Sequence, residues 1–223
     1  MSPAKKEAKK APAKKAPAKK AKTAKQPLPA LERMEVRLAG SGGQGLLLAG
    51  LVLAEAAGLY DGREVAMVQS YGPEARGGAS KAEVIVSDNP IDYPLCTTVD
   101  LLLALNQEAA DTYAWDVDSS ALVVVDADLV KHAPTSMAVA LPFTATARDK
   151  LKKIMVANVV ALGAISQLTG VASLKALEKA LLARVPAGTE ALNKKALSLG
   201  AKLARDYKEK AKPAQQVLSA ADF

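Results

Sequence analysis

Residues 40–45 read Gly-Ser-Gly-Gly-Gln-Gly, which matches the pattern G-x-G-x-x-G. Residues 34–39 before them predict a short strand. Residues 46–57 after them predict a helix that is apolar on most faces and therefore buried. Glycines allow a tight strand-to-helix turn, and the helix N-terminus offers free N–H groups to an anion. The sequence predicts a phosphate-bearing ligand at this glycine loop, which consists of Gly40, Ser41, Gly42, Gly43, Gln44 and Gly45.

Two common nucleotide sites fit this loop less well. A nicotinamide dinucleotide site expects an acidic residue at the end of the second strand, where this chain has Gln69 and Ser70. A P-loop expects Lys and Ser or Thr after the last glycine, where this chain has Leu46 and Leu47. Direct NAD binding and a tight turn without any ligand stay open as alternatives.

The rest of the chain alternates between strand-length and helix-length segments. Later strands are predicted at 64–70, 82–87, 100–105, 121–126 and 139–141, with a helix at 107–115. From residue 149 the pattern is helical, with Ser173 and Thr189 before two amphipathic helices and Pro213 as the predicted end of the second. This alternation predicts a three-layer α/β/α fold with a largely parallel, or mixed, sheet, a Rossmann-like glycine loop and a helical C-terminal part.

The net charge of +7 is unevenly distributed. Residues 1–25 hold ten of the 30 basic residues and one of the 23 acidic residues, so they carry +9 and the remainder carries −2. We therefore expect a disordered Lys/Ala/Pro-rich tail and linker at 1–30, a domain at 31–212 and a C-terminal tail at 213–223. The basic tail could bind nucleic acid non-specifically or steer an acidic partner.

Cysteine and histidine are too few for several kinds of site. The chain contains one cysteine, Cys96, and one histidine, His132. A disulfide within the chain and an iron–sulfur cluster ligated by it are therefore excluded, and a structural zinc site lacks ligands. We expect a reducing, cytoplasmic location without a secretory signal, and no segment is apolar for long enough to cross a membrane.

A second glycine-rich loop follows the strand predicted at 64–70. Its candidate site residues are Ser70, Tyr71, Gly72, Pro73, Glu74, Arg76, Gly77 and Gly78. Such a loop lies at the carboxyl end of a strand, where open α/β sheets place ligands and contacts. Arg76 is suited to a carboxylate or phosphate. The loop is predicted to contact substrate or a neighbouring subunit, and a surface turn with a solvated ion pair is the alternative.

The two loops together resemble those of the gamma subunits of 2-oxoacid:ferredoxin oxidoreductases. The similarity continues through 80–87, Ile-Asp-Tyr-Pro at 91–94 and 100–105, and through 158–163 and 193–200 in the helical part. The second loop looks most like the 2-oxoglutarate type, with pyruvate and branched-chain 2-oxoacid types as alternatives. The resemblance covers about residues 34–208.

The resemblance implies a complex that converts 2-oxoglutarate, coenzyme A and oxidised ferredoxin to succinyl-CoA, CO2 and reduced ferredoxin. It implies that alpha and beta subunits, with or without a delta subunit, hold thiamine diphosphate, Mg2+ and [4Fe-4S] clusters. This chain would provide no catalytic residue and hold no metal. Its glycine loop would contact coenzyme A or shape the subunit interface.

The remaining residues with reactive, polar or aromatic side chains are expected to have structural roles. Cys96 is expected to be a partly buried thiol and His132 a loop residue without a catalytic partner. Asp126 and Asp128, after an apolar strand, are expected to cap a helix or form a turn. Asn158 lies in an otherwise apolar helix and is expected to have a structural or interface role. Tyr113 and Trp115 are expected to pack.

Overall fold

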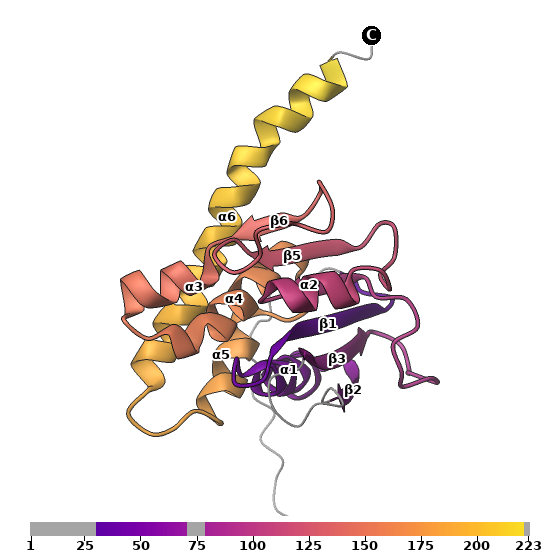
Figure 1. Ribbon diagram of the computed structural model, residues 1–223. Coiled ribbons are helices and arrows are strands. Elements are labelled where there is room, and N and C mark those ends of the chain that lie inside the picture. Colours follow the sequence, from indigo (N-terminus) through magenta and orange to yellow (C-terminus); the bar gives the residue numbers. More distant parts are fainter. Residues whose placement is uncertain (1–29, 71–78, 221–223) are drawn as a thin grey trace, which may run out of the picture.

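The computed structural model describes residues 30–70 and 79–220, with side chains described for 30–69 and 80–211. A six-stranded sheet in the order β2-β3-β1-β4-β5-β6 forms its centre (Figure 1). The strands are β1 (Met34–Ser41), β2 (Glu64–Ser70), β3 (Ala79–Ser87), β4 (Leu101–Ala104), β5 (Leu122–Asp126) and β6 (Val139–Leu141). Every strand predicted from the sequence is present, within three residues at each end.

One strand of the sheet runs against the others. β1, β4, β5 and β6 pair in parallel, whereas β3 pairs antiparallel with both β1 and β2. The cause is local: β2 and β3 are adjacent in sequence and in the sheet, and residues 71–78 are too few for the helical crossover that a parallel pair needs. The sheet is therefore mixed and largely parallel, as the sequence predicted.

Helices cover both faces of the sheet, which confirms the three-layer α/β/α fold (Figure 1). They are α1 (Leu46–Glu55), α2 (Gln107–Tyr113), α3 (Phe143–Ala145), α4 (Ala157–Thr169), α5 (Leu174–Leu182) and α6 (Glu190–Ala220), with shorter turns η1 (Ala56–Asp61), η2 (Thr146–Lys150) and η3 (Ile154–Val156).

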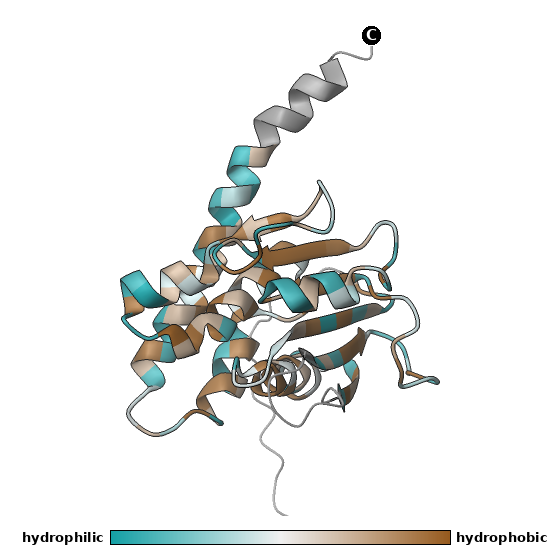
Figure 2. Cartoon of the chain, viewed as in Figure 1, coloured by the Kyte–Doolittle hydropathy of each residue, from teal (hydrophilic) through white to brown (hydrophobic). Residues whose placement is uncertain are grey.

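The core is divided unequally by the sheet. The larger apolar cluster joins one face of β1, through Val36 and Leu38, to α1, α4, α5 and α6. A smaller cluster lies on the other face, where Ala39 and Leu102 pack with Ala109 of α2. Figure 2 shows the strands as largely hydrophobic, which agrees with their burial between the helical layers.

The helical C-terminal part is built around a close crossing of α4 and α6. A Cβ added to Gly163 would clash with the carbonyl oxygen of Leu197, and a Cβ added to Gly200 would clash with that of Val160. Only glycine permits two helix backbones to approach this closely. Burial of α4 thus depends on one glycine from each helix.

Two helix ends, and the hydrogen bonds at the start of α6, differ from the sequence prediction. α1 continues through the π-helical turn η1, so Gly58 lies within helix, and the left-handed Gly62 (φ 78°) ends it. α6 begins directly after Thr189, but the Thr189 hydroxyl donates to the carbonyl oxygen of Pro186 and accepts from Asn193. The prediction that Pro213 ends α6 is wrong, because the helix continues to Ala220 and extends beyond the other elements (Figure 1). Proline has a φ that a helix can accept, although it removes one backbone hydrogen bond.

No helix within residues 30–70 and 79–220 combines the length and the apolar character that crossing a bilayer requires.

Candidate functional site

The two glycine-rich loops start at the same edge of the sheet. Ser41, at the end of β1, is opposite Ala79 at the start of β3, and Ser70, at the end of β2, is opposite Lys81. The ends of β1 and β2 therefore lie on either side of β3. Ser70 is described as the last residue of β2, but Tyr71, Gly72, Pro73, Glu74, Arg76, Gly77 and Gly78 lie outside the described residues.

Gln44 holds the glycine loop together. Its Oε1 accepts a hydrogen bond of 2.8 Å from the backbone N–H of Ser41, and its Nε2 donates one of 3.2 Å to the carbonyl oxygen of Leu105, just after β4. A Cβ added to Gly40 would lie 2.3 Å from Oε1 of this amide, so the Gln44 side chain would have to move. Gly40 belongs to β1, and Gln44 positions the loop through both ends of its amide.

Gly45 connects the loop to α4. It has a left-handed backbone (φ 72°), and an added Cβ would lie 2.5 Å from Nδ2 of Asn158. That nitrogen donates a hydrogen bond of 2.9 Å to the carbonyl oxygen of Gly45, while Oδ1 accepts from the N–H of Val159. The structural role expected for Asn158 is confirmed, and its function is to attach α4 to the glycine loop.

Gly42 and Gly43 differ from the other glycines of the loop. Both are exposed, and a Cβ added to either meets no described atom within 4 Å. Their backbone N–H groups have no acceptor among the described residues. Internal packing therefore does not explain glycine at these positions, although Gly43 also needs it for its φ of 90°. The two N–H groups lie two and three residues before Gly45, the N-cap of α1, near the helix end whose dipole favours an anion.

Asp126 and Asp128 shape the end of β5. Asp126 is fully buried, and its carboxylate accepts from the N–H and hydroxyl of Thr144 and from the N–H of Asp128. Asp128 accepts from the N–H of Ala145. Burial raises the pKa of Asp126 above its usual value. Both residues cap the start of α3, as expected, and no cluster of three metal-ligating side chains occurs in the described part of the chain.

The remaining candidates have mixed outcomes. The backbone of His132 bonds to the Gln107 side chain at the surface, as expected of a loop residue. Cys96 is half-buried, and burial, followed by the nearby carboxylates of Glu83 and Glu35, raises its thiol pKa to about 12. The expectation that Trp115 packs is wrong, because its side chain is 91% exposed. It follows the short helix α2, where the chain turns away from the sheet.

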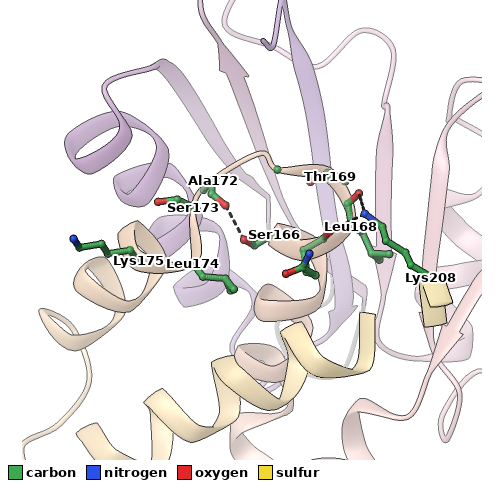
Figure 3. Close-up of a pocket in the computed structure, with 10 residues that line it drawn as sticks. Ser166, Leu168, Thr169, Ala172, Ser173, Leu174, Lys175 and Lys208 are labelled. Atoms are coloured by element: carbon green, nitrogen blue, oxygen red, sulfur yellow. Dashed lines mark hydrogen bonds between the residues drawn. The ribbon is translucent and has the colours of Figure 1, made fainter. Parts of the chain in front are cut away.

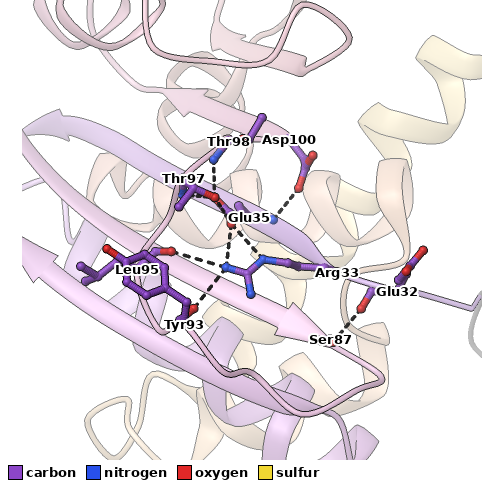
Figure 4. Close-up of polar contacts among 9 residues, drawn as sticks. All are labelled: Glu32, Arg33, Glu35, Ser87, Tyr93, Leu95, Thr97, Thr98 and Asp100. Atoms are coloured by element: carbon purple, nitrogen blue, oxygen red, sulfur yellow. Dashed lines mark hydrogen bonds and ion pairs between the residues drawn. The ribbon is translucent and has the colours of Figure 1, made fainter.

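A buried polar cluster around Glu35 was missed by the sequence reasoning. The Glu35 carboxylate accepts from the N–H groups of Thr97 and Thr98 at 2.6 and 2.8 Å and pairs with Arg33 at 2.7 Å (Figure 4). Arg33 also donates to the carbonyl oxygens of Tyr93 and Leu95. The available signal was the pair of charged residues, Glu35 and Arg37, in a strand of a sheet that is covered on both faces. The cluster fixes segment 93–98 at the sheet edge opposite the glycine loop.

A pocket of about 550 Å3 lies far along α4 from the glycine loop, between the end of α4, the start of α5 and α6 (Figure 3). Lys208 of α6 donates to the carbonyl oxygens of Gln167 and Leu168 at the end of α4. At the start of α5, the Asp61 carboxylate already accepts from the N–H and hydroxyl of Ser173. Lys208 and Ser173 are therefore already engaged in hydrogen bonds at the ends of α4 and α5.

Comparison with known proteins agrees with this architecture. Residues 35–203 match the family described as pyruvate ferredoxin/flavodoxin oxidoreductase. The chain is 47% identical to 2-oxoglutarate synthase subunit KorC of Methanocaldococcus jannaschii over 178 residues, which cover 78% of this chain and 95% of that protein.

Solved structures show the same fold. A keto/oxoacid ferredoxin oxidoreductase gamma subunit from Geobacter sulfurreducens is 48% identical, with a TM-score of 0.71 over 78% of this chain and 97% of that one. The 2-oxoglutarate:ferredoxin oxidoreductase of Magnetococcus marinus, solved with 2-oxoglutarate, coenzyme A and succinyl-CoA bound, is 26% identical. Its TM-score is 0.70, and the match covers 78% of this chain but 31% of that longer chain. The chain therefore belongs to the pyruvate ferredoxin/flavodoxin oxidoreductase family, among its gamma-type subunits.

Proposed function

We propose that this chain is the gamma subunit of a cytoplasmic 2-oxoglutarate:ferredoxin oxidoreductase and that its glycine loop contacts coenzyme A. The complex converts 2-oxoglutarate and coenzyme A to succinyl-CoA and CO2, and ferredoxin accepts the electrons. The names of the most similar relatives support the 2-oxoglutarate type. Pyruvate and branched-chain 2-oxoacids are the alternative substrates, since a ketoisovalerate oxidoreductase is also among the relatives.

The observation that carries this proposal is the open face of Gly42 and Gly43. Two backbone N–H groups that have no acceptor among residues 30–70 and 79–220 lie next to the start of α1 and form a donor pair for a phosphate oxygen, and the absence of side chains leaves room for close approach. Gln44 and Asn158 hold the loop from behind, so the donors are fixed before a ligand arrives. Fixed donors lose little entropy on binding, which favours affinity.

The redox and thiamine chemistry belongs to partner subunits in this proposal. One cysteine cannot ligate a [4Fe-4S] cluster. We assign thiamine diphosphate, Mg2+ and the clusters to alpha and beta subunits, with or without a delta subunit. The carboxyl ends of β1 and β2 would face them, and the 70–78 loop would lie on the substrate side, with Arg76 as its ionic contact.

Two glycines with matching backbones allow a controlled test. Gly43 (φ 90°) and Gly188 (φ 86°) both have open space around an added Cβ, so Gly43→Ala and Gly188→Ala impose similar backbone strain. In the assembled complex, Gly43→Ala should raise KM for coenzyme A about tenfold, equivalent to about 1.4 kcal/mol, while Gly188→Ala leaves it unchanged. Gly42→Val, which has no left-handed backbone to strain, should act like Gly43→Ala.

The result that would contradict the proposal is an unchanged KM for coenzyme A in both loop variants. Purification of the native chain without thiamine- or cluster-containing partners would contradict the subunit assignment. Tight NAD(H) binding by the isolated chain would favour the nucleotide-binding alternative. For the tail, deletion of residues 2–25 tests polyanion binding, which should disappear together with its salt dependence.

A further inference from the structure

An exposed segment lies next to the glycine loop, just before α4 in the chain. Turns η2 and η3 lead directly into α4, and Asn158 in the first turn of α4 is bonded to Gly45 of the loop. Residues 150–155 run from the end of η2 into η3, just before α4, and are therefore adjacent to the candidate site. We call them the 150–155 surface.

Two large apolar side chains are exposed on this surface. Met155 is 88% exposed and Ile154 is 55% exposed, whereas the next residue, Val156, is buried in the main core. The single 3-10 turn that contains all three can direct only one of them inward. Adjacent exposed apolar residues of this size mark contact sites more often than isolated ones.

The backbone of the surface is held in a strained conformation. Lys152 has φ of 56°, and it is the sole non-glycine residue with positive φ in the described part of the chain. Such a conformation costs about 1–2 kcal/mol. Hydrogen bonds from the N–H groups of Lys152 and Lys153 to the carbonyl oxygens of Arg148 and Ala147 maintain it. These two bonds close the C-terminal end of η2 in the way that a left-handed residue commonly ends a helix, and they set the direction in which the chain enters η3.

The apolar pair has a basic rim. Lys150, Lys152 and Lys153 are exposed, and Asp149, the nearest acid in sequence, is already paired with Arg148 at 2.9 Å. Three exposed lysines thus precede Ile154 and Met155 in the same short segment. An apolar centre with a charged rim is the usual anatomy of a protein–protein contact.

A relative indicates what kind of neighbour this fold has. In the Magnetococcus marinus enzyme the same fold makes up 31% of a longer chain, so there it is covalently attached to further parts of the same enzyme. In this chain an equivalent neighbour must be bound non-covalently. We propose that the 150–155 surface docks a partner subunit of the same oxidoreductase, with Met155 and Ile154 entering an apolar pocket that has acidic residues at its rim. This inference rests on the proposed function.

The test measures assembly of the full chain with its co-expressed partner subunits. Ile154→Glu combined with Met155→Glu should weaken the Kd for the remaining subunits about a hundredfold in biolayer interferometry. The matched control is Leu59→Glu, because Leu59 is 74% exposed in η1, at the far end of α1 from the glycine loop. Its Kd should stay within about threefold of the unchanged chain. Replacing Lys150, Lys152 and Lys153 with Gln should lower the association rate about tenfold and flatten its salt dependence.

Each result separates this inference from the proposed function. If the unchanged chain assembles but the double variant binds equally well, the surface assignment is overturned and the proposed function stands. If the double variant assembles normally but loses electron transfer to ferredoxin, the surface docks ferredoxin and the inference is again wrong. If the unchanged chain does not assemble, both fail. Met155→Ala, with thermal unfolding as a check on folding, should weaken binding in the same direction.

Discussion

Asn158 donates a hydrogen bond of 2.9 Å to the carbonyl oxygen of Gly45, which lies 113 residues earlier in the chain. The bond joins the first turn of α4 to the residue at which the glycine loop enters α1. The loop therefore has two independent attachments, one through Asn158 and one through Gln44 to Leu105. The position of the proposed donors, Gly42 and Gly43, depends on both.

Asn158→Asp removes the first attachment and leaves the second, through Gln44, in place. It keeps an oxygen for the N–H of Val159 but removes the donor to Gly45 and places a negative charge against a carbonyl oxygen. We expect a loss of about 1–3 kcal/mol in the free energy of unfolding. KM for coenzyme A should rise several-fold in the assembled enzyme. Urea unfolding and steady-state kinetics measure the two effects, and lower stability with unchanged KM would show that the bond does not position the site.

Gly200→Ala tests the crossing of α4 and α6. The added methyl group would collide with the backbone of Val160, and neither helix can move without disturbing the core. We expect destabilisation by about 3 kcal/mol or more, or failure to fold. Ser198→Ala, at an exposed position of the same helix, is the control and should change the free energy of unfolding by less than about 0.5 kcal/mol. Equal stability of the two variants in urea would exclude a tight crossing.

Glu35→Gln tests the cluster that holds segment 93–98. The variant loses the negative charge of the carboxylate, which pairs with Arg33 and whose oxygens accept hydrogen bonds from the N–H groups of Thr97 and Thr98. A destabilisation of about 2–3 kcal/mol is expected, with the exposed Glu32→Gln as a nearly neutral control. Amide hydrogen exchange at Thr97 and Thr98 should accelerate more than in β1. Uniform acceleration across the domain would instead indicate a global effect without local anchoring.

Cys96 should be unreactive at neutral pH. Burial raises its thiol pKa from 9.0 to about 12, so at pH 8 the folded protein should react with a disulfide reagent at least about a hundredfold more slowly than the unfolded chain. Because the folded pKa is the higher one, this group contributes stability below pH 9 that is lost as the pH rises toward 12. Cys96→Ser should remove that part of the alkaline dependence. Rapid labelling of the folded chain at pH 8 would contradict a buried thiol.

The sequence alone was sufficient where short-range patterns decide structure. Apolar runs predicted β2 and β6 at their observed bounds, Ser173 was identified as the N-cap of α5, and Asp126 and Asp128 were identified as capping residues. The two strands depend on burial of a single segment and Ser173 on a neighbour three residues away, whereas the N–H groups that Asp126 and Asp128 cap lie 17–18 residues later in the chain. The two loop motifs, taken together, also identified the family.

Tertiary structure decided what depends on residues distant in sequence. The partner of Asn158 and the glycine crossing at Gly163 and Gly200 each require two segments whose meeting no local pattern encodes. The sequence predicted one continuous loop of six ligand-binding residues. In the structure, Gly40, Gln44 and Gly45 are engaged in internal contacts while Gly42 and Gly43 are open, because β4 and α4 pack against one side of the loop only.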